Sequence, residues 1–117
     1  MLDLSHRKLD VWKMSLELTK NIYSITEKYP KSELFGLVSQ LRRASVSVLS
    51  NISEGAARRS KLERRRFYEI SRSSLVEVDT QLEISLGLKY IEPNSLPEIS
   101  EKLNHLFAKL TGLINAT

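Results

Sequence analysis

Nine consecutive residues concentrate the positive charge of this 117-residue chain. Positions 58 to 66 hold six basic residues and one acidic residue, a net charge of +5, whereas the whole chain carries +4. A second basic pair, Arg42 and Arg43, precedes this segment. Lysine and arginine neutralise phosphate groups and release counterions, so this charge distribution favours a nucleic-acid partner. Helix packing that joins the two segments would give one positive surface.

The spacing of the basic residues places several of them on one helical face. On a helix that begins at Lys61, steps of four, three and four lead from Lys61 through Arg65 and Tyr68 to Arg72, and Arg58 lies just before it. An exposed tyrosine ring in such a stripe can stack on a nucleobase. The candidate nucleic-acid-binding residues are Arg42, Arg43, Arg58, Arg59, Lys61, Arg64, Arg65, Arg66, Tyr68 and Arg72.

The same stripe also fits a solvated helix face. In that interpretation the arginines pair with Glu63, Glu69 and acidic residues of a neighbouring subunit, and Tyr68 covers the core. Six cations in nine residues exceed what solubility requires, which favours binding. A rival function is that of an adaptor whose basic face docks on an acidic partner protein. Salt-dependent RNA binding separates the two functions.

Asn51 and Glu54 lie just before the basic segment and also have two interpretations. In the structural one, Glu54 pairs with an arginine and Asn51 satisfies the backbone at the end of a helix. In the functional one, both residues belong to a binding surface. The sequence leaves both open.

Patterns typical of catalysis and metal binding are weak. His6 and His105 do not form the paired Glu-x-x-His motifs of a di-metal bundle, because Lys102 lies three residues before His105. The chain has no cysteine, its glycines are scattered singly, and no serine has a nucleophile-elbow pattern. We therefore expect no enzyme activity, no cofactor and no metal site.

Apolar residues repeat with a helical period in four segments. The first segment runs from about Leu9 to Tyr29 and stops at Pro30. The second begins after Ser32 and ends near Gly55. Its expected core residues are Leu34, Val38, Leu41, Ser45, Val48 and Ile52. Serines on the second and third segments are expected to let those two helices approach closely.

The third and fourth segments each begin at a capping-box pattern. Ser60 and Glu63 predict a helix start at Lys61, and Ser95 and Glu98 predict a second one. The third helix continues toward residue 89, with expected core residues Phe67, Ile70, Leu75, Val78, Leu82 and Leu86. The fourth is expected to bury Leu96, Ile99, Leu103, Leu106, Leu110 and Leu113.

These segments predict an all-α fold, an antiparallel up-down-up-down four-helix bundle over residues 9–117. Short connections favour this order, and residues 1–8 are expected to form a loosely ordered N-terminal segment. No run of 18 apolar residues and no signal-peptide pattern is present, so we expect no membrane contact. The lack of cysteine suits a cytoplasmic location.

Three motifs carry a resemblance to a known family: Leu9-Asp-Val-Trp12, Gln40-Leu-Arg-Arg43 and Asn51-Ile-Ser-Glu-Gly55, followed by Glu63, Phe67 and Glu77. Over roughly residues 9 to 90 the chain resembles the four-helix-bundle family encoded in intervening sequences of bacterial large-subunit ribosomal RNA genes. That family includes the accessory variability proteins of diversity-generating retroelements. The resemblance implies a homo-oligomer, a pentameric ring in the retroelement members, whose basic surface engages a reverse transcriptase and RNA.

The chain departs from the family pattern at two places. Where many members resemble Ser-Ile-Pro-Ala-Asn, this chain has Ser47-Val-Leu-Ser-Asn51, which predicts a second helix without a proline kink. Where the family often has Gly-Ser, this chain has Ser73-Ser74, so the closest approach of the third helix to a neighbour is expected to differ.

Overall fold

The computed structural model describes residues 1–117 and contains four α-helices and no strand, so the predicted all-α class is confirmed. The helices are α1 Asp10–Thr26, α2 Ser39–Ala56, α3 Lys61–Gly87 and α4 Leu96–Ala116. Shorter helical turns precede or connect them: η1 Ser5–Lys8, η2 Lys31–Glu33, η3 Leu34–Val38 and η4 Pro93–Ser95. No helix combines the length and the apolar character needed to span a bilayer.

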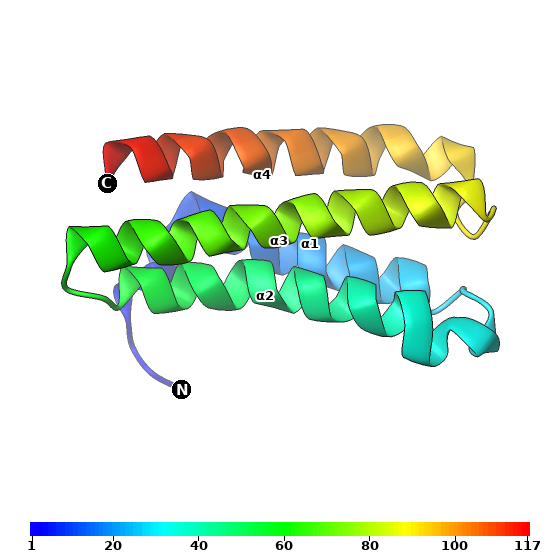
Figure 1. Ribbon diagram of the computed structural model, residues 1–117, viewed down its shortest axis with the longest axis horizontal. Helices are drawn as coiled ribbons and strands as arrows, with labels where there is room; N and C mark the ends of the chain where they lie inside the picture. Colours follow the sequence, from blue (N-terminus) through cyan, green and yellow to red (C-terminus); the bar gives the residue numbers. More distant parts are fainter.

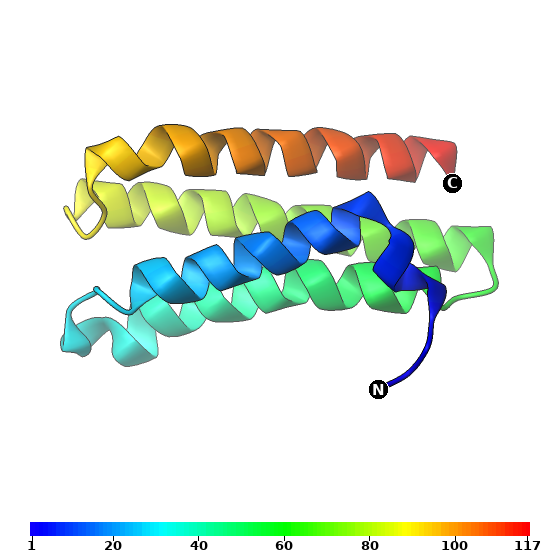
Figure 2. The same ribbon diagram turned by 180° about the vertical axis from the view of Figure 1, so that it is seen from behind.

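The four helices lie side by side along the long axis of a molecule that measures 43 × 27 × 20 Å (Figures 1 and 2). Helix α1 packs against α2 and α4, and α3 packs against the same two helices. In Figure 1 the order of colours along the chain reverses from each helix to the next. The four helices therefore enclose one core between them.

The N-terminal segment is part ordered turn and part extended chain. Residues 1–4 have no regular secondary structure and run away from the bundle in Figure 1. Ser5–Lys8 form a 3₁₀ turn, and the ring of His6 lies 5.4 Å from that of Trp12. This aromatic contact gives the segment more local structure than its lack of periodicity indicated.

The predicted core residues are correct in the middle of the helices and wrong at two places. Leu34 is half exposed, because the chain kinks at Gly36 (φ −111°, ψ −115°) and turns the start of the segment away from the α2 seam. In α3, Ile70 is exposed, whereas Tyr68 and Ser71 are buried. The predicted core stripe at the start of α3 was assigned to the wrong helical face. The prediction placed the apolar Ile70 in the core, whereas the small polar Ser71 is the buried residue.

Helices α2 and α3 approach closely over small side chains, as expected from their serines. Ser71 Oγ donates a hydrogen bond across the interface to the Val48 carbonyl (2.7 Å), and the hydroxyls of Ser47 and Ser74 lie 2.9 Å apart. A Cβ atom at Gly55 would lie only 2.7 Å from the Tyr68 ring. Helix α2 continues through Ser47–Asn51 without a break, so the prediction of no proline kink is confirmed.

One of the two predicted helix caps forms. Ser60 Oγ accepts a hydrogen bond from the Glu63 amide (3.3 Å), and α3 begins at Lys61 as predicted. Ser95 makes no side-chain cap bond, so that prediction is wrong. Its backbone is helical (φ −81°, ψ −16°) because η4 leads directly into α4, whereas a capping serine normally has an extended backbone.

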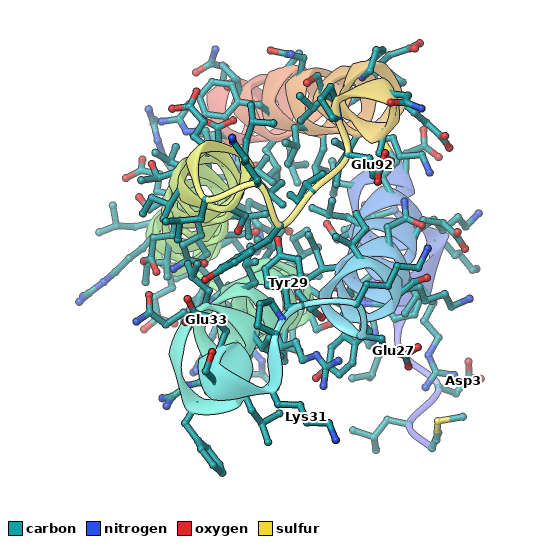
Figure 3. The ribbon with its side chains drawn as sticks, turned by 90° about the vertical axis from the view of Figure 1, so that its right-hand side faces the viewer. Asp3, Glu27, Tyr29, Lys31, Glu33 and Glu92 are labelled. Carbon is teal, nitrogen blue, oxygen red and sulfur yellow. The ribbon has the colours of Figure 1, made fainter.

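The opposite end of the bundle is closed by a tyrosine pair and a glutamate. Figure 3 looks onto this end and shows Tyr29 between the helix ends, with Glu33 beside it on the connection into α2. Tyr90 donates a hydrogen bond from its hydroxyl to Glu33 Oε2 (3.0 Å), and the rings of Tyr29 and Tyr90 lie 5.4 Å apart. Glu33 thereby joins the α1–α2 connection to the α3–α4 connection.

Candidate nucleic-acid interface

The basic segment lies at the turn between α2 and α3, which is at the left of Figure 1. Helix α2 ends at Ala56, four residues form the connection, and the Ser60 cap starts α3 at Lys61. The first turn of a helix carries unpaired amides and the positive end of the helix dipole. The dipole and the basic side chains therefore add positive potential at the same place.

Two of the arginines hold this turn together. Arg64 donates hydrogen bonds from Nη1 to the carbonyls of Arg58 (3.1 Å) and Arg59 (2.7 Å). The guanidinium of Arg58 lies over the ring of Phe67, 4.7 Å from its centroid. These contacts orient Arg58 and Arg64 but leave their positive charges uncompensated by any carboxylate.

The side chains of three cations in the segment are exposed and have no hydrogen-bond or ion-pair partner: Arg59, Lys61 and Arg66. Arg65 differs, because its Nε lies 3.2 Å from Glu69 Oε1 in an exposed i,i+4 pair. Such an exposed pair contributes well under 1 kcal/mol, so phosphate can compete for Arg65. The segment thus presents cations rather than a network of internal salt bridges.

Tyr68 does not belong to the exposed stripe, and the prediction of a stacking ring there is wrong. Its side chain is 4% exposed and packs against α2 at Gly55. Burial raises the pKa of the Tyr68 phenol, and the nearby positive charge of Arg64 lowers it by less. Tyr68 covers the core, as the alternative interpretation of this stripe held.

Arg72 also faces a neighbouring helix. Its Nη1 donates a hydrogen bond to Thr111 Oγ1 (3.1 Å) on α4, and its guanidinium lies 5.6 Å from the ring centroid of Phe107. The predicted line of cations from Lys61 to Arg72 therefore divides into a free basic end and an arginine docked on α4.

Arg42 and Arg43 lie far from the basic segment. Arg58 lies fifteen residue steps after Arg43, mostly along the helix α2, which corresponds to about 22 Å at 1.5 Å per residue. Arg42 is held on α1, where its Nε donates to Thr26 Oγ1 (3.0 Å) and its guanidinium lies 4.6 Å from the Tyr23 ring centroid. Arg43 is exposed and unpaired. Helix packing therefore does not bring the two basic segments together.

Asn51 makes its side-chain hydrogen bonds within its own helix. Its Nδ2 donates hydrogen bonds to the Ser47 carbonyl (2.8 Å) and to Ser47 Oγ (3.0 Å) within α2. Glu54 is exposed and forms no ion pair with an arginine, so the expected Glu54–arginine pair is absent. No three His, Asp or Glu side chains converge to hold a metal ion.

A second exposed surface was not anticipated from the sequence. A groove of about 680 Å³ opens along α1, η3 and the start of α2. Phe35 borders this groove with 93% of its surface exposed, and Leu34 and Val46 are also exposed. The one feature of the sequence that could have indicated this surface is Gly36, a glycine inside a segment with a helical period, where a break in the helix is favoured. We call this surface the α1–α2 groove.

The fold and the basic turn define an all-helical, four-helix protein with a concentrated positive end. The chain belongs to the 23S rRNA-intervening sequence protein family, whose model matches residues 7–112. A crystal structure at 1.70 Å of a protein of unknown function from the S23 ribosomal protein family of Bacteroides thetaiotaomicron VPI-5482 has the same fold. The TM-score is 0.81 at 21% sequence identity, and the match covers 90% of this chain and 95% of that one. No curated protein matches the chain.

Proposed function

We propose that this chain is a non-enzymatic, cytoplasmic homo-oligomer that binds nucleic acid, chiefly RNA, through the α2–α3 turn. The antiparallel up-down-up-down bundle is the rigid support for that turn. The observation that carries the proposal is the set of free cations Arg59, Lys61 and Arg66, beside Arg58 and Arg64, whose charges no carboxylate compensates.

Phosphate binding uses this arrangement directly. Arginine and lysine side chains that are already exposed and unpaired need not break an ion pair before they contact a phosphate. The start of α3 adds its dipole to the same potential. Because the buried Tyr68 cannot stack on a base, the expected contacts are to the backbone, and the binding should depend weakly on sequence.

The test is the salt dependence of RNA binding. Fluorescence anisotropy with an unstructured single-stranded RNA should give a slope of log affinity against log salt of about −2 to −3.5, for roughly three to five phosphate contacts. The variant Arg59→Gln/Lys61→Gln/Arg66→Gln should weaken binding to all RNA sequences and reduce the slope by about two units, because each contact contributes about 0.7.

A matched control removes the same charge elsewhere. Lys13, Lys28 and Lys109 are exposed lysines without an ion pair, and none lies in the basic segment. The variant Lys13→Gln/Lys28→Gln/Lys109→Gln should keep most of the slope. Equal losses in the two triple variants would show that only net charge matters. No salt-dependent binding by the wild type would favour the adaptor that docks on an acidic protein or a reverse transcriptase.

Two further properties of the purified protein are expected. RNA and DNA should stay intact with the protein in magnesium or manganese. Metal-dependent cleavage that is lost in Glu54→Gln or Glu63→Gln would identify an enzyme instead. The mass in sedimentation should exceed the 13.4 kDa of one chain, with a ring of five expected from the resemblance to the retroelement accessory proteins.

A further inference from the structure

A polar pocket of about 530 Å³ opens between α2 and α3, which lie side by side in Figures 1 and 2. Helix α2 contributes Gln40 and Arg43 to its lining, and helix α3 contributes Glu77 and Gln81. Phe35 borders the pocket from η3. No residue of the basic segment belongs to the lining, so the pocket is separate from the α2–α3 turn. We call it the Arg43–Glu77 pocket.

The two charged side chains of this pocket are not paired with each other. Arg43 and Glu77 are both exposed and line the same pocket, yet neither side chain takes part in an ion pair. Space therefore separates the cation on α2 from the carboxylate on α3. A ligand in that space satisfies both groups if it presents acceptors on one edge and donors on another.

Gln81 adds an acceptor that has no partner in the protein. Its Oε1 atom is buried and makes no hydrogen bond. A buried oxygen without a partner is uncommon in folded proteins, and this one calls for a donor from outside the chain. The hydroxyls of Ser47 and Ser74 also line the pocket, but they are bonded to each other. Glu77 and Gln81 stand one turn apart on α3, so the donors of a ligand are expected on that side.

Phe35 gives the pocket a flat apolar border. The kink at Gly36 turns this residue outward, and it is 93% exposed. Exposed aromatic rings and arginine are the groups on which proteins stack the bases of single-stranded RNA. A fitting ligand is therefore planar, with donors on one edge and acceptors on the neighbouring edge.

Guanine is the nucleobase whose edges match this arrangement. Its Watson–Crick edge carries two adjacent donors, N1–H and the 2-amino group, which one carboxylate accepts as a bidentate pair. Its O6 and N7 atoms are the acceptors that arginine contacts most often in specific recognition. Adenine and cytosine place a ring acceptor beside the amino group, and uracil has one donor between two acceptors. Each of these three bases would set an acceptor against the carboxylate of Glu77.

We propose that the Arg43–Glu77 pocket binds one unpaired guanine of an RNA strand. Glu77 accepts hydrogen bonds from N1–H and the 2-amino group, and Gln81 Oε1 accepts from the remaining amino hydrogen. Arg43 donates to O6 and N7 from the α2 side, and the base stacks on Phe35. This inference rests on the RNA binding of the proposed function and adds base recognition to it. The basic segment contacts phosphates with little regard to sequence, and the pocket adds a preference for strands that offer a guanine.

Fluorescence anisotropy with a matched set of RNAs tests this recognition in the wild-type protein. A single-stranded RNA of uridines alone is compared with RNAs whose central uridine is replaced by guanosine, adenosine or inosine. All of them carry the same number of phosphates, so the electrostatic part of the affinity cancels. The guanosine RNA should bind about five- to one-hundred-fold tighter than the uridine RNA, as for one bidentate base contact. Inosine lacks the 2-amino group and should lose most of that gain.

Glu77→Gln separates base recognition from electrostatics, because the two predict opposite signs. Removal of a carboxylate makes the chain more positive, so electrostatics alone would strengthen the binding of every RNA. Loss of the bidentate acceptor should instead lower the affinity for the guanosine RNA to that for the uridine RNA.

Glu83→Gln is the matched control. Glu83 is also an exposed carboxylate of α3 without an ion pair, but it does not line the pocket. This variant has the same net charge as Glu77→Gln and should keep the guanosine preference. Both substitutions lie on the surface, so circular dichroism should show an unchanged helical fold.

Guanosine alone gives a second readout that needs no contact with phosphate. Its titration into the full chain should shift the NMR signals of the side-chain amides of Gln40 and Gln81, which line the pocket. Uridine should leave these signals in place.

Three results would overturn the proposed pocket. Equal affinities for all the RNAs, without shifts on addition of guanosine, would reject guanine recognition and leave phosphate binding by the basic segment intact. A guanosine preference that survives in Glu77→Gln, or that is lost equally in Glu83→Gln, would place the base elsewhere. Absence of RNA binding by the wild type would reject the proposed function, and unshifted amide signals with guanosine would then reject the pocket as well.

Discussion

The end of the bundle at the α2–α3 turn differs from the opposite end in what it leaves exposed. At the α2–α3 turn, Arg59, Lys61 and Arg66 are free, and Leu62 is the one large apolar side chain exposed within the basic segment. At the opposite end the fully exposed side chain is the aromatic Phe35. The first end suits phosphate, and the second suits a planar apolar ring.

The side chains and carbonyls that surround an arginine decide how available its charge is. Arg42 lies within α2, where the neighbouring helix α1 offers a carbonyl, a hydroxyl and an aromatic ring to its guanidinium. Arg59 lies in a four-residue connection, and only its carbonyl is used, as an acceptor for Arg64. Each Arg-Arg pair therefore contains one arginine held against an aromatic ring, Arg42 or Arg58, and one free arginine, Arg43 or Arg59.

The largest expected effect is the loss of stability on removal of the Tyr68 side chain, which distinguishes a core role of this residue from a role in RNA binding. Tyr68→Ala should lower the free energy of unfolding by about 3 to 5 kcal/mol, because a buried aromatic ring is lost under Gly55. Urea denaturation measures this loss. RNA affinity of the fraction that stays folded should be nearly unchanged, since the ring contacts protein and not a base.

Tyr68→Phe is the control for this substitution. The raised pKa of Tyr68 means that the folded state holds its phenol proton more tightly than the unfolded state, whose pKa is about 10. The contribution of the Tyr68 phenol to the free energy of unfolding is complete below pH 10 and is lost as the pH rises through the folded pKa. Tyr68→Phe should remove this contribution to the pH dependence of stability. A Tyr68→Ala protein of normal stability with weakened RNA binding would restore the stacking interpretation.

The sequence was sufficient for the number of helices, most of the core and the start of α3. Leu41, Val48 and Ile52 in α2 and Leu106 and Leu110 in α4 are buried as predicted, because a helical period records which side faces the core. The position of the basic segment at a helix start was also predictable, since the Ser60 cap is a local interaction.

Contacts between different helices could not be predicted from local sequence patterns. The partners of Arg42 and Arg72 lie on other helices, Thr26 on α1 and Thr111 on α4, and no local spacing encodes them. Tyr68 was misplaced because its burial depends on Gly55, a residue of the preceding helix. Phe35 was missed because a single glycine turned its segment away from the core.

A pair of glycine substitutions compares the packing of the two ends. At Gly55 an added Cβ would lie 2.7 Å from Tyr68 Cε1 and 3.1 Å from Phe67 Cβ, atoms that buried packing holds in place. At Gly36 it would meet only the carboxylate oxygen of Glu33, at 2.6 Å, and that side chain can rotate away.

Gly55→Ala should therefore cost about 1 to 3 kcal/mol from overpacking, against a gain of about 1 kcal/mol in helix propensity. The net loss should be about 0 to 2 kcal/mol in urea denaturation. Gly36→Ala should cost less, about the worth of the Glu33 hydrogen bonds to Leu37 and Tyr90 that it disturbs. The reverse order would show that the α2–α3 end is the looser of the two.

The smallest expected effects on stability are those of replacing the two serines that were predicted to cap helices. One serine lies at each end of the bundle. Ser60→Ala removes the acceptor of the Glu63 amide and should cost about 1 kcal/mol in thermal or urea unfolding. Ser95→Ala should cost less than about 0.5 kcal/mol, because the Ser95 side chain makes no cap bond and its backbone is already helical. Ser60→Ala should also let the start of α3 fray, so the salt dependence of RNA binding should change for this variant and not for Ser95→Ala. Equal stability losses at the two serines would mean that η4 opens in solution and that Ser95 caps α4 after all.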